Sequence, residues 1–357
     1  MIRVAPILPL LVCLVEVLKA DPDGRLPAPA AGMVESLRRI GSTEGFKPYQ
    51  GNPILTICPA GSFDAGALGS ACVLRVGEVF HLYYEAWGVR NTGKWIAKEY
   101  ETLQIGHATS ADGIHWTKDP KNPVLPRGGE GDFDRTGVWD PYVIHEDGRF
   151  RMWYGGGGGS RPNLGWAFAT SADGSRFNKS GLIGTGHQTS SEDCHVVRDP
   201  KSDLYFMYSW YGREKPNAFK LVTSATPTDF DFNSPKTLTV AGDDSRMCKF
   251  GHVLGDDDGW HLFYSNYDNR HGRDSTVRYA TSSDGVRWQA RNKGLIKGLD
   301  ADVLCVADDM YLMVDAPEDG FDANGTDILL AVYNGRLPDL AGKPLVPEES
   351  SQSADKP

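Results

Sequence analysis

The stretch Gly137-Val-Trp-Asp-Pro-Tyr-Val-Ile-His-Glu-Asp-Gly-Arg-Phe-Arg-Met-Trp-Tyr154 contains the pattern on which the rest of the chain is built. It predicts two short strands, rich in β-branched and aromatic residues, that are joined by an Asp-Gly turn. Asp140 stands at the entrance of the first strand. The same pattern returns along the chain, so the stretch is one unit of a repeat.

Five copies of the unit align on a valine in the entrance strand. They are Ala71-Cys-Val73-Leu, Tyr142-Val143-Ile, His195-Val196-Val, His252-Val253-Leu and Asp302-Val303-Leu. An aromatic second strand and a third strand follow each copy, and a fourth strand follows in the first four units. Three of the units also carry a Ser-x-Asp-Gly turn after the third strand, which begins at Ser110, Ser171 and Ser282. Repeats of four short strands are typical of a β-propeller.

The fifth unit lacks a fourth strand, because the chain turns polar after Tyr333. Asn52-Pro-Ile-Leu55, which precedes the first unit, copies the fourth strand Asn122-Pro-Val-Leu125. We therefore expect the N-terminal strand to complete the last blade. The predicted fold is an all-β, five-bladed β-propeller of four-stranded antiparallel blades, and the ring is closed by an N-terminal strand.

The ends of the chain differ in composition from this repeat. Residues 1–20 resemble a signal peptide, with Arg3, an apolar run from Val4 to Leu18 and a small residue at Ala20. We expect residues 21–48 to be a linker with a short helix near Met33–Arg39, residues 49–336 to be the propeller, and residues 337–357 to be a disordered tail. The signal predicts a secreted protein, extracellular or periplasmic.

Composition narrows the classes of partner. The 357 residues are 40% hydrophobic and 24% charged, and the net charge of −10 argues against nucleic acid. Beyond the signal no stretch is long and apolar enough to span a membrane. Cys13 would leave with the signal, and there is no C-x-x-C pair among the five other cysteines, Cys58, Cys72, Cys194, Cys248 and Cys305. We expect most of these to be buried hydrophobes, and one disulfide stays open.

Acidic residues recur at the strand entrances. Three residues before the aligned valines stand Ser70, Asp140, Asp193, Phe250 and Asp300, and Glu192 precedes Asp193. In a four-stranded meander these entrances lie on the face that also gathers the loops after the second strands. Carboxylates that meet in one pocket are what glycoside hydrolysis requires, and tryptophans there can stack on sugar rings. The candidate stacking residues are Trp87, Trp139 and Trp210, while turn capping is the alternative role for any one aspartate.

These residues resemble the five-bladed propeller glycoside hydrolases of families 43, 32, 68, 62, 117 and 130. Trp139-Asp-Pro-Tyr-Val143 is similar to the second-blade pattern Asp-Pro-x-Val of family 43, which implies an orienting role for Asp140. Glu192-Asp-Cys-His-Val196 resembles the third-blade pattern Glu-Gly-Pro-x-Ile, with Asp193 and Cys194 in place of Gly-Pro, which implies that Glu192 is the acid.

The first blade departs from the family pattern, because Ser70 stands where an acidic base is expected. The nearest acid is Asp64, which we expect to be the base or nucleophile. Its counterpart in the second unit is Asp134, so a structural role stays open. In some relatives a histidine at the position of His252 lies near a central metal or water, or serves as the acid; a hydrogen-bonded core histidine is the alternative. We expect no cofactor, although the resemblance allows a structural calcium ion.

The expected function is that of a secreted glycoside hydrolase that cleaves a poly- or oligosaccharide, with Asp193, His252 and Asp300 among the sugar contacts. Basic residues in the loops after the second strands favour an anionic glycan, and a furanosidic glycan stays open as well. These residues are Arg90, Lys94, Lys98, Arg161, Arg213, Lys215, Arg270 and Arg273. One alternative is a non-catalytic carbohydrate-binding propeller that lost the first-blade base. A sialidase is another, since the Ser-x-Asp-Gly turns resemble those of that family.

Overall fold

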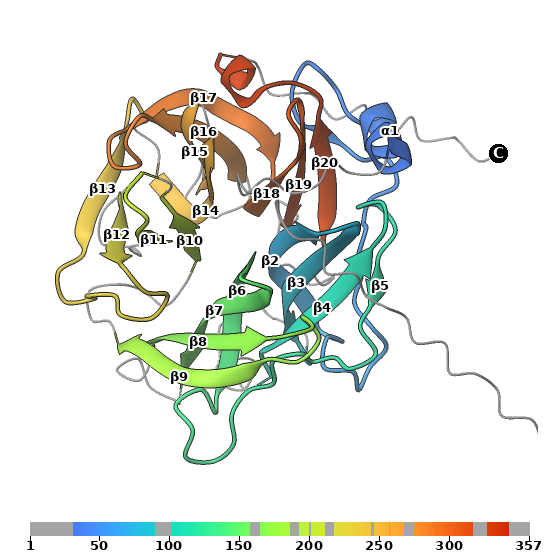
Figure 1. The fold of residues 1–357 in the computed structure, drawn as a ribbon. Coiled ribbons are helices and arrows are strands. Elements are labelled where there is room, and N and C mark those ends of the chain that lie inside the picture. Colours follow the sequence, from blue (N-terminus) through green and yellow to red (C-terminus); the bar gives the residue numbers. More distant parts are fainter. Residues whose placement is uncertain are drawn as a thin grey trace, which may run out of the picture.

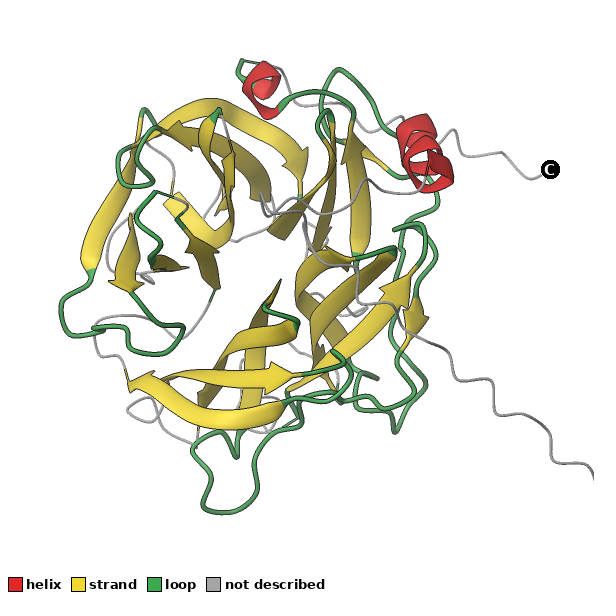
Figure 2. Ribbon diagram, in the orientation of Figure 1, coloured by secondary structure: helices red, strands yellow, loops and turns green. Residues whose placement is uncertain are grey.

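The structure is a computed structural model that describes residues 31–89, 102–157, 165–185, 193–199, 201–210, 218–243, 246–256, 258–267, 275–316 and 327–342. This part of the chain is all-β apart from one α-helix and one short 3-10 helix. The strands form several four-stranded antiparallel sheets that lie around a common centre (Figures 1 and 2). The arrangement agrees with the repeat seen in the sequence.

The first two repeat units each form a sheet of their own, with strands paired in chain order. The first sheet contains β2 (Ala67–Val76), β3 (Val79–Trp87), β4 (Gln104–Ser110) and β5 (Thr117–Lys118). The second contains β6 (Gly137–Glu146), β7 (Arg149–Gly157), β8 (Gly165–Ser171) and β9 (Asn178–Thr185). The opening stretch of the sequence is thus β6, a two-residue turn and the start of β7.

The next two units form one eight-stranded sheet. The first half is β10 (Cys194–Arg198), β11 (Tyr205–Trp210), β12 (Ala218–Ser224) and β13 (Lys236–Ala241). The second half is β14 (Arg246–Asp256), β15 (Gly259–Tyr267), β16 (Ser275–Ser282) and β17 (Trp288–Lys297). Each half is an antiparallel meander, and the two join through a short parallel contact of β13 with β17, where Val240 pairs with Trp288.

The last sheet joins the two ends of the described chain. It contains β18 (Leu299–Ala307), β19 (Met310–Ala316), β20 (Leu329–Tyr333) and the N-terminal strand β1 (Lys47–Pro48). The side chain of Asn52 then exchanges two hydrogen bonds with the backbone of Leu330, and Asn122 does the same with the backbone of His107 in the first sheet. The two Asn-Pro segments therefore occupy equivalent edge positions, as their sequences predict.

The expected domain boundaries shift at both ends. Helix α1 (Ala31–Ile40) buries Met33 and Leu37 in the apolar core, so the described part of the expected linker packs as part of the domain. At the other end, Leu337–Leu340 form a 3-10 helix whose two leucines are fully buried. The start of the expected disordered tail is therefore ordered, because both leucines pack into a cluster that contains Phe46 and Tyr333. Neither helix is long and apolar enough to cross a membrane.

The three Ser-x-Asp-Gly turns share one hydrogen-bond pattern. In each, the serine Oγ accepts the backbone N–H of the aspartate, and the aspartate Oδ1 accepts the backbone N–H two residues further on. Burial raises the pKa of Asp112, but hydrogen bonds from His115, Ile114 and Ser110 outweigh it and lower the pKa to about 2. The turns hold their own backbone in place, so their likeness to sialidase turns has a structural cause.

Candidate active site

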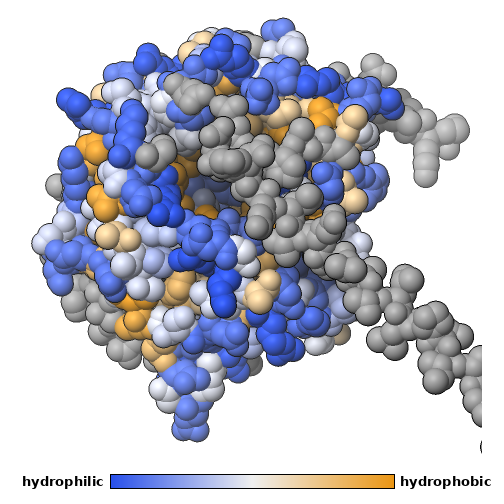
Figure 3. Space-filling view, in the orientation of Figure 1, coloured by the Kyte–Doolittle hydropathy of each residue, from blue (hydrophilic) through white to orange (hydrophobic). Residues whose placement is uncertain are grey.

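The first strands of the repeat units lie nearest the common centre of the sheets (Figure 1). Residues of these strands and of the segments that enter them line a pocket. In the view of Figure 3, hydrophilic side chains cover most of the described surface around this centre. The pocket is lined by Ser70, Ala71, Cys72, Asp140, Pro141, Tyr142, Asp193, Cys194, His195, Gly251, Asp300, Ala301 and Asp302. We call it the axial pocket.

Three aspartates occupy equivalent places in the axial pocket. Asp140, Asp193 and Asp300 are buried, and all three adopt a left-handed backbone conformation, with φ of 46°, 51° and 56°. Such a conformation is uncommon outside glycine, and its repetition at one position of three strands indicates a constraint of the site. Ladder irregularities beside Asp140 and Asp300 turn these residues out of the regular pleat.

The aspartates are linked to their neighbours by hydrogen bonds. The backbone N–H of Asp193 donates to Asp140 Oδ2 at 3.1 Å, and Ser70 Oγ donates to Asp300 Oδ2 at 3.3 Å. We call Asp140, Asp193 and Asp300 the acidic layer. Ser70 therefore does contact the acidic layer although it carries no charge. Several buried carboxyl groups that lie close together can donate protons to a bound sugar and accept protons from it.

Glu85 supports this layer and was missed by the sequence reasoning. It follows Tyr84 within the aromatic strand β3, is 6% exposed, and its Oε2 accepts the backbone N–H of Asp140 at 3.0 Å. Asp315 is another buried acid near the end of the second strand of its sheet, β19, and burial raises its pKa well above the usual range. An acid directly after two tyrosines was the available signal for Glu85.

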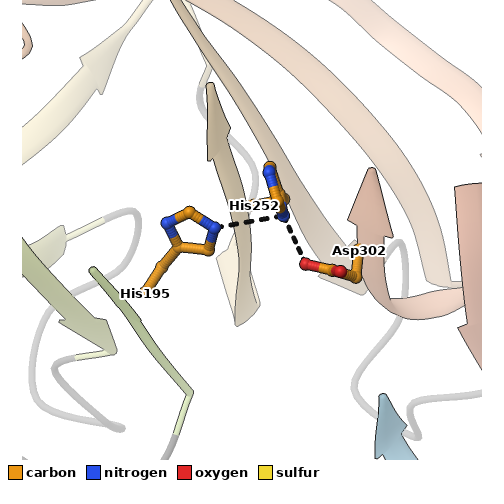
Figure 4. Close-up of side chains that lie close together, drawn as sticks. All are labelled: His195, His252 and Asp302. Carbon is orange, nitrogen blue, oxygen red and sulfur yellow. Dashed lines mark hydrogen bonds and ion pairs between the residues drawn. The ribbon is translucent and has the colours of Figure 1, made fainter. Parts of the chain in front are cut away.

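A second layer is formed by the residues directly before the aligned valines. His195 Nε2 lies 3.1 Å from His252 Nδ1, and Asp302 Oδ1 contacts that same nitrogen (Figure 4). All three side chains are buried. Burial and the neighbouring His252 hold the pKa of His195 well below its usual value, so this imidazole is neutral. The alignment had placed these residues in register, but only His252 had been singled out.

Asp64 is not among the residues that line the axial pocket. It is fully buried, its Oδ2 pairs with Lys118 Nζ at 2.5 Å, and Tyr84 contacts it as well. Asp134 repeats this arrangement with Lys179 and Tyr154. The placement counts against Asp64 as the base and favours the structural role that its twin had left open.

Two of the three tryptophans proposed to stack on sugars have described side chains, and these also lie elsewhere. Trp87 and Trp139 are 2% and 6% exposed and pack in one apolar cluster with Ala67 and Leu103. They bridge the first two sheets, which explains why large aromatic residues stand there. Neither side chain presents a surface for stacking on a sugar.

Other predicted residues lie outside the described part of the chain. Glu192, Arg161 and all the other basic loop residues belong to the ranges that the structure does not describe, as does the side chain of Trp210. Of the five cysteines outside residues 1–20, the side chains of four are described: Cys58, Cys72, Cys194 and Cys305 are free thiols, and Cys72 and Cys194 are buried.

Comparison with known proteins finds relatives that match part of the chain. No protein-family model matches the chain. A segment of 162 residues is 30% identical to uncharacterized protein Rv1502 of Mycobacterium tuberculosis, covering 41% of this chain and 49% of that protein. Another of 110 residues is 36% identical to β-1,2-mannobiose phosphorylase of Thermoanaerobacter sp., covering 30% and 35%. The chain thus spans about half the length of the first relative and about a third of the second.

Solved structures match over most of the chain. A glycosyl hydrolase from Bacteroides ovatus has a TM-score of 0.64 at 17% identity, covering 82% of this chain and 94% of that one. The β-1,2-mannobiose phosphorylase from Listeria innocua has a TM-score of 0.63 at 15% identity, covering 83% and 98%. A glycoside hydrolase family 130 structure, from work on enzymes that target β-1,2 mannosidic linkages in Candida mannan, has a TM-score of 0.61 at 17% identity, covering 82% and 94%. The resemblance to these glycoside hydrolases is confirmed at the level of the fold.

Proposed function

We propose that this protein processes glycans by cleaving glycosidic bonds in the axial pocket. The observation that carries the proposal is the convergence of Asp140, Asp193 and Asp300, each buried and each in a left-handed conformation. Residues held in such conformations cost of order 1–3 kcal/mol each and cluster at functional sites. The similarity to glycosidases and to mannobiose phosphorylases supports carbohydrate as the substrate.

The proposed reaction is hydrolysis. The glycosidic C–O bond breaks, the leaving oxygen takes a proton from a carboxylic acid, and water adds to the anomeric carbon and gives its proton to a carboxylate. We assign the acid to Glu192 and the orienting role to Asp140, whose backbone N–H is fixed by Glu85. Asp193 and Asp300 line the pocket as contacts for the sugar. Asp64 takes no part, since its carboxylate pairs with Lys118.

Phosphorolysis is the second candidate, and the 36% identity with a mannobiose phosphorylase favours it. Here inorganic phosphate replaces water at the anomeric carbon, and the product is a sugar 1-phosphate. The proton still goes to the leaving oxygen, so the same acid serves both reactions.

The architecture of the proposed enzyme is a five-bladed β-propeller closed by the N-terminal strand. The pairing of β1 with β20 and the contribution of β2, β6, β10, β14 and β18 to one pocket support it. Export through residues 1–20 belongs to the proposal as well, and secretion of the full-length chain from an expression host tests it. An anionic glycan is a further part, and it rests on Arg161 and the other basic loop residues.

The test is product analysis with the full chain. β-1,2-Mannobiose and panels of neutral and anionic oligosaccharides are incubated with the protein, with and without inorganic phosphate. Free sugar without phosphate supports hydrolysis, and sugar 1-phosphate supports phosphorolysis. Binding of glycans without any product overturns the enzyme proposal and favours a carbohydrate-binding protein.

A matched pair of variants links the activity to the pocket. Asp140→Asn replaces one carboxyl group of the pocket with an amide, whereas Asp147→Asn makes the same change in an exposed turn at a similar φ of 52°. We expect turnover to disappear in the first variant only, with both melting temperatures close to that of the wild type.

A further inference from the structure

We propose that His195, His252 and Asp302 form a binding site for a divalent metal ion of the zinc class in the second layer of the axial pocket. The three residues come from β10, β14 and β18, each directly before the aligned valine. Such an ion would tie three inner strands together across the axis. The proposal goes beyond the cleavage of glycans and does not depend on it.

The spacing of the donor atoms suits one small ion. One ligand atom from each residue lies within 4.8 Å of the others. Two imidazole nitrogens bound to Zn²⁺ at about 2.0–2.1 Å in tetrahedral geometry lie about 3.3 Å apart. The observed distance between His195 Nε2 and His252 Nδ1 is 3.1 Å, so these two nitrogens need to move by only a few tenths of an ångström. Asp302 Oδ1 touches His252 Nδ1 directly, so its carboxylate has to draw back further to make room for the ion.

Hydrogen bonding alone does not account for the cluster. His252 Nδ1 contacts both His195 Nε2 and Asp302 Oδ1 (Figure 4). A ring nitrogen carries either one proton or one lone pair, so it can serve one of these partners well but not both. If His252 Nδ1 carries the proton and donates it to Asp302, this nitrogen has no lone pair left to accept a hydrogen bond from His195 Nε2. A cation between the three donors satisfies all of them at once.

The first sheet contains the same residue types in an arrangement that hydrogen bonds do explain. His107 Nδ1 lies 3.0 Å from Asp119 Oδ2, and His107 Nε2 lies 3.0 Å from His81 Nδ1. Each nitrogen of His107 has a partner of its own, so one proton per contact completes the chain. This relay provides an internal control for buried histidines that need no metal.

The surroundings also fit a metal ligand set. Asp302 Oδ2 accepts the backbone N–H of Val73 at 2.7 Å, and in metal sites such a hydrogen bond to a ligand holds its carboxylate in the orientation that the metal needs. His195 is 1% exposed, and its Nδ1 has no hydrogen-bond partner among the described residues. Burying an imidazole nitrogen without a hydrogen-bond partner lowers the stability of the folded protein. A bond from His195 Nε2 to a metal ion would offset this loss.

The donor set selects the class of ion. Two imidazoles and one carboxylate suit Zn²⁺ and neighbouring transition metals. Ca²⁺ prefers six to eight oxygen ligands, and the cluster supplies one carboxylate. The donors therefore favour a transition metal over the calcium ion that the family resemblance allowed.

Metal binding by the full chain tests the proposal. The protein is stripped with a chelator, dialysed, and titrated with Zn²⁺, Co²⁺ or Ca²⁺ in separate samples, with metal content measured by mass spectrometry. We expect one tightly bound Zn²⁺ per chain, no Ca²⁺ in competition with it, and visible Co²⁺ absorption bands typical of nitrogen and oxygen ligands. Zn²⁺ should also raise the melting temperature.

Variants locate the ion. Asp302→Asn keeps a side-chain oxygen that can accept the N–H of Val73, and His195→Ala removes one imidazole. Each variant should bind Zn²⁺ more than roughly 10–100-fold more weakly than the wild type, because that is the cost of losing only a residue that hydrogen-bonds to a metal ligand. His107→Ala should bind as the wild type does. The proposal is overturned if the stripped wild type binds no Zn²⁺ or Co²⁺, or if Asp302→Asn retains wild-type affinity. If His195→Ala does not fold, the Co²⁺ spectrum of the wild type and the Asp302→Asn titration still decide.

Discussion

Replacing Lys118 with methionine should destabilise the protein strongly, because it leaves the Asp64 carboxylate buried without its cation. The Asp64 side chain is 1% exposed, and its ion pair with Lys118 is 2.5 Å long. Removing one partner of a buried pair costs about 3–5 kcal/mol, whereas the net worth of the pair is much smaller. We therefore expect Lys118→Met to lower the free energy of unfolding by about 3–5 kcal/mol and the melting temperature by roughly 6–10 °C.

The twin pair sets the scale for this measurement. Lys179 binds Asp134 at 2.7 Å, with the carboxylate 2% exposed, so Lys179→Met should cost nearly the same. Lys118 also donates to the backbone carbonyl of Thr56 at 2.6 Å, and its loss should add about 1 kcal/mol. Asp64→Asn should cost less than Lys118→Met, because the remaining ammonium is 20% exposed and can reach water.

Guanidinium unfolding of the four single variants, Asp134→Asn included, gives these differences, and turnover per folded molecule is measured on the same samples. If the Asp64–Lys118 and Asp134–Lys179 pairs only stabilise the fold, all four variants should lose stability, and the molecules that fold should keep the turnover of the wild type. Full stability with abolished turnover in Asp64→Asn, but not in Asp134→Asn, refutes the reasoning and restores Asp64 as a catalytic base.

Three further changes have definite expected outcomes. Gly251→Ala should lower stability by about 1–3 kcal/mol, because a Cβ there would lie 2.4 Å from the carbonyl oxygen of Phe263, while Gly255→Ala on the same strand, with no atom nearer than 3.6 Å, should be neutral in thermal melts. Trp139→Ala should cost about 3–5 kcal/mol of stability and leave KM unchanged in the folded fraction, since the ring packs in an apolar cluster; a raised KM at full stability would instead support sugar stacking. Burial and the neighbouring His107 lower the pKa of His81 to about 3, so between pH 3 and about pH 6.5 the unfolded chain binds more protons than the folded one, and the free energy of unfolding should fall by up to about 1.4 kcal/mol for each pH unit of acidification. The denaturant midpoint should therefore depend less steeply on pH in His81→Gln than in the wild type, and equal slopes would contradict the reasoning.

The repeat made much of the fold predictable. Alternating strands, Asp-Gly turns and the copied Asn-Pro segments are local signals, and each appears where the sequence placed it. The aligned valine also fixed the register, so the three aspartates before it fall into one layer of the pocket. A side chain's height along the axis follows from strand register alone.

Contacts between sheets were beyond this reasoning. The partner of Asp64 is a lysine more distant in sequence, at the end of β5, so its ion pair depends on how the edge strand folds back. Trp87 and Trp139 follow an aromatic pattern that fits either a sugar platform or an apolar contact, and only the packing of the first two sheets distinguishes them. Glu85 was missed because its partner is the backbone of Asp140 in the next sheet.

Turnover of Asp140→Asn, compared with Asp64→Asn on the same glycan, tests the central claim most directly. If bond cleavage takes place in the axial pocket, kcat per folded molecule should fall by at least about 10²-fold in Asp140→Asn and stay near the wild-type value in Asp64→Asn. Near-normal turnover in Asp140→Asn would contradict the assignment of the axial pocket as the catalytic site.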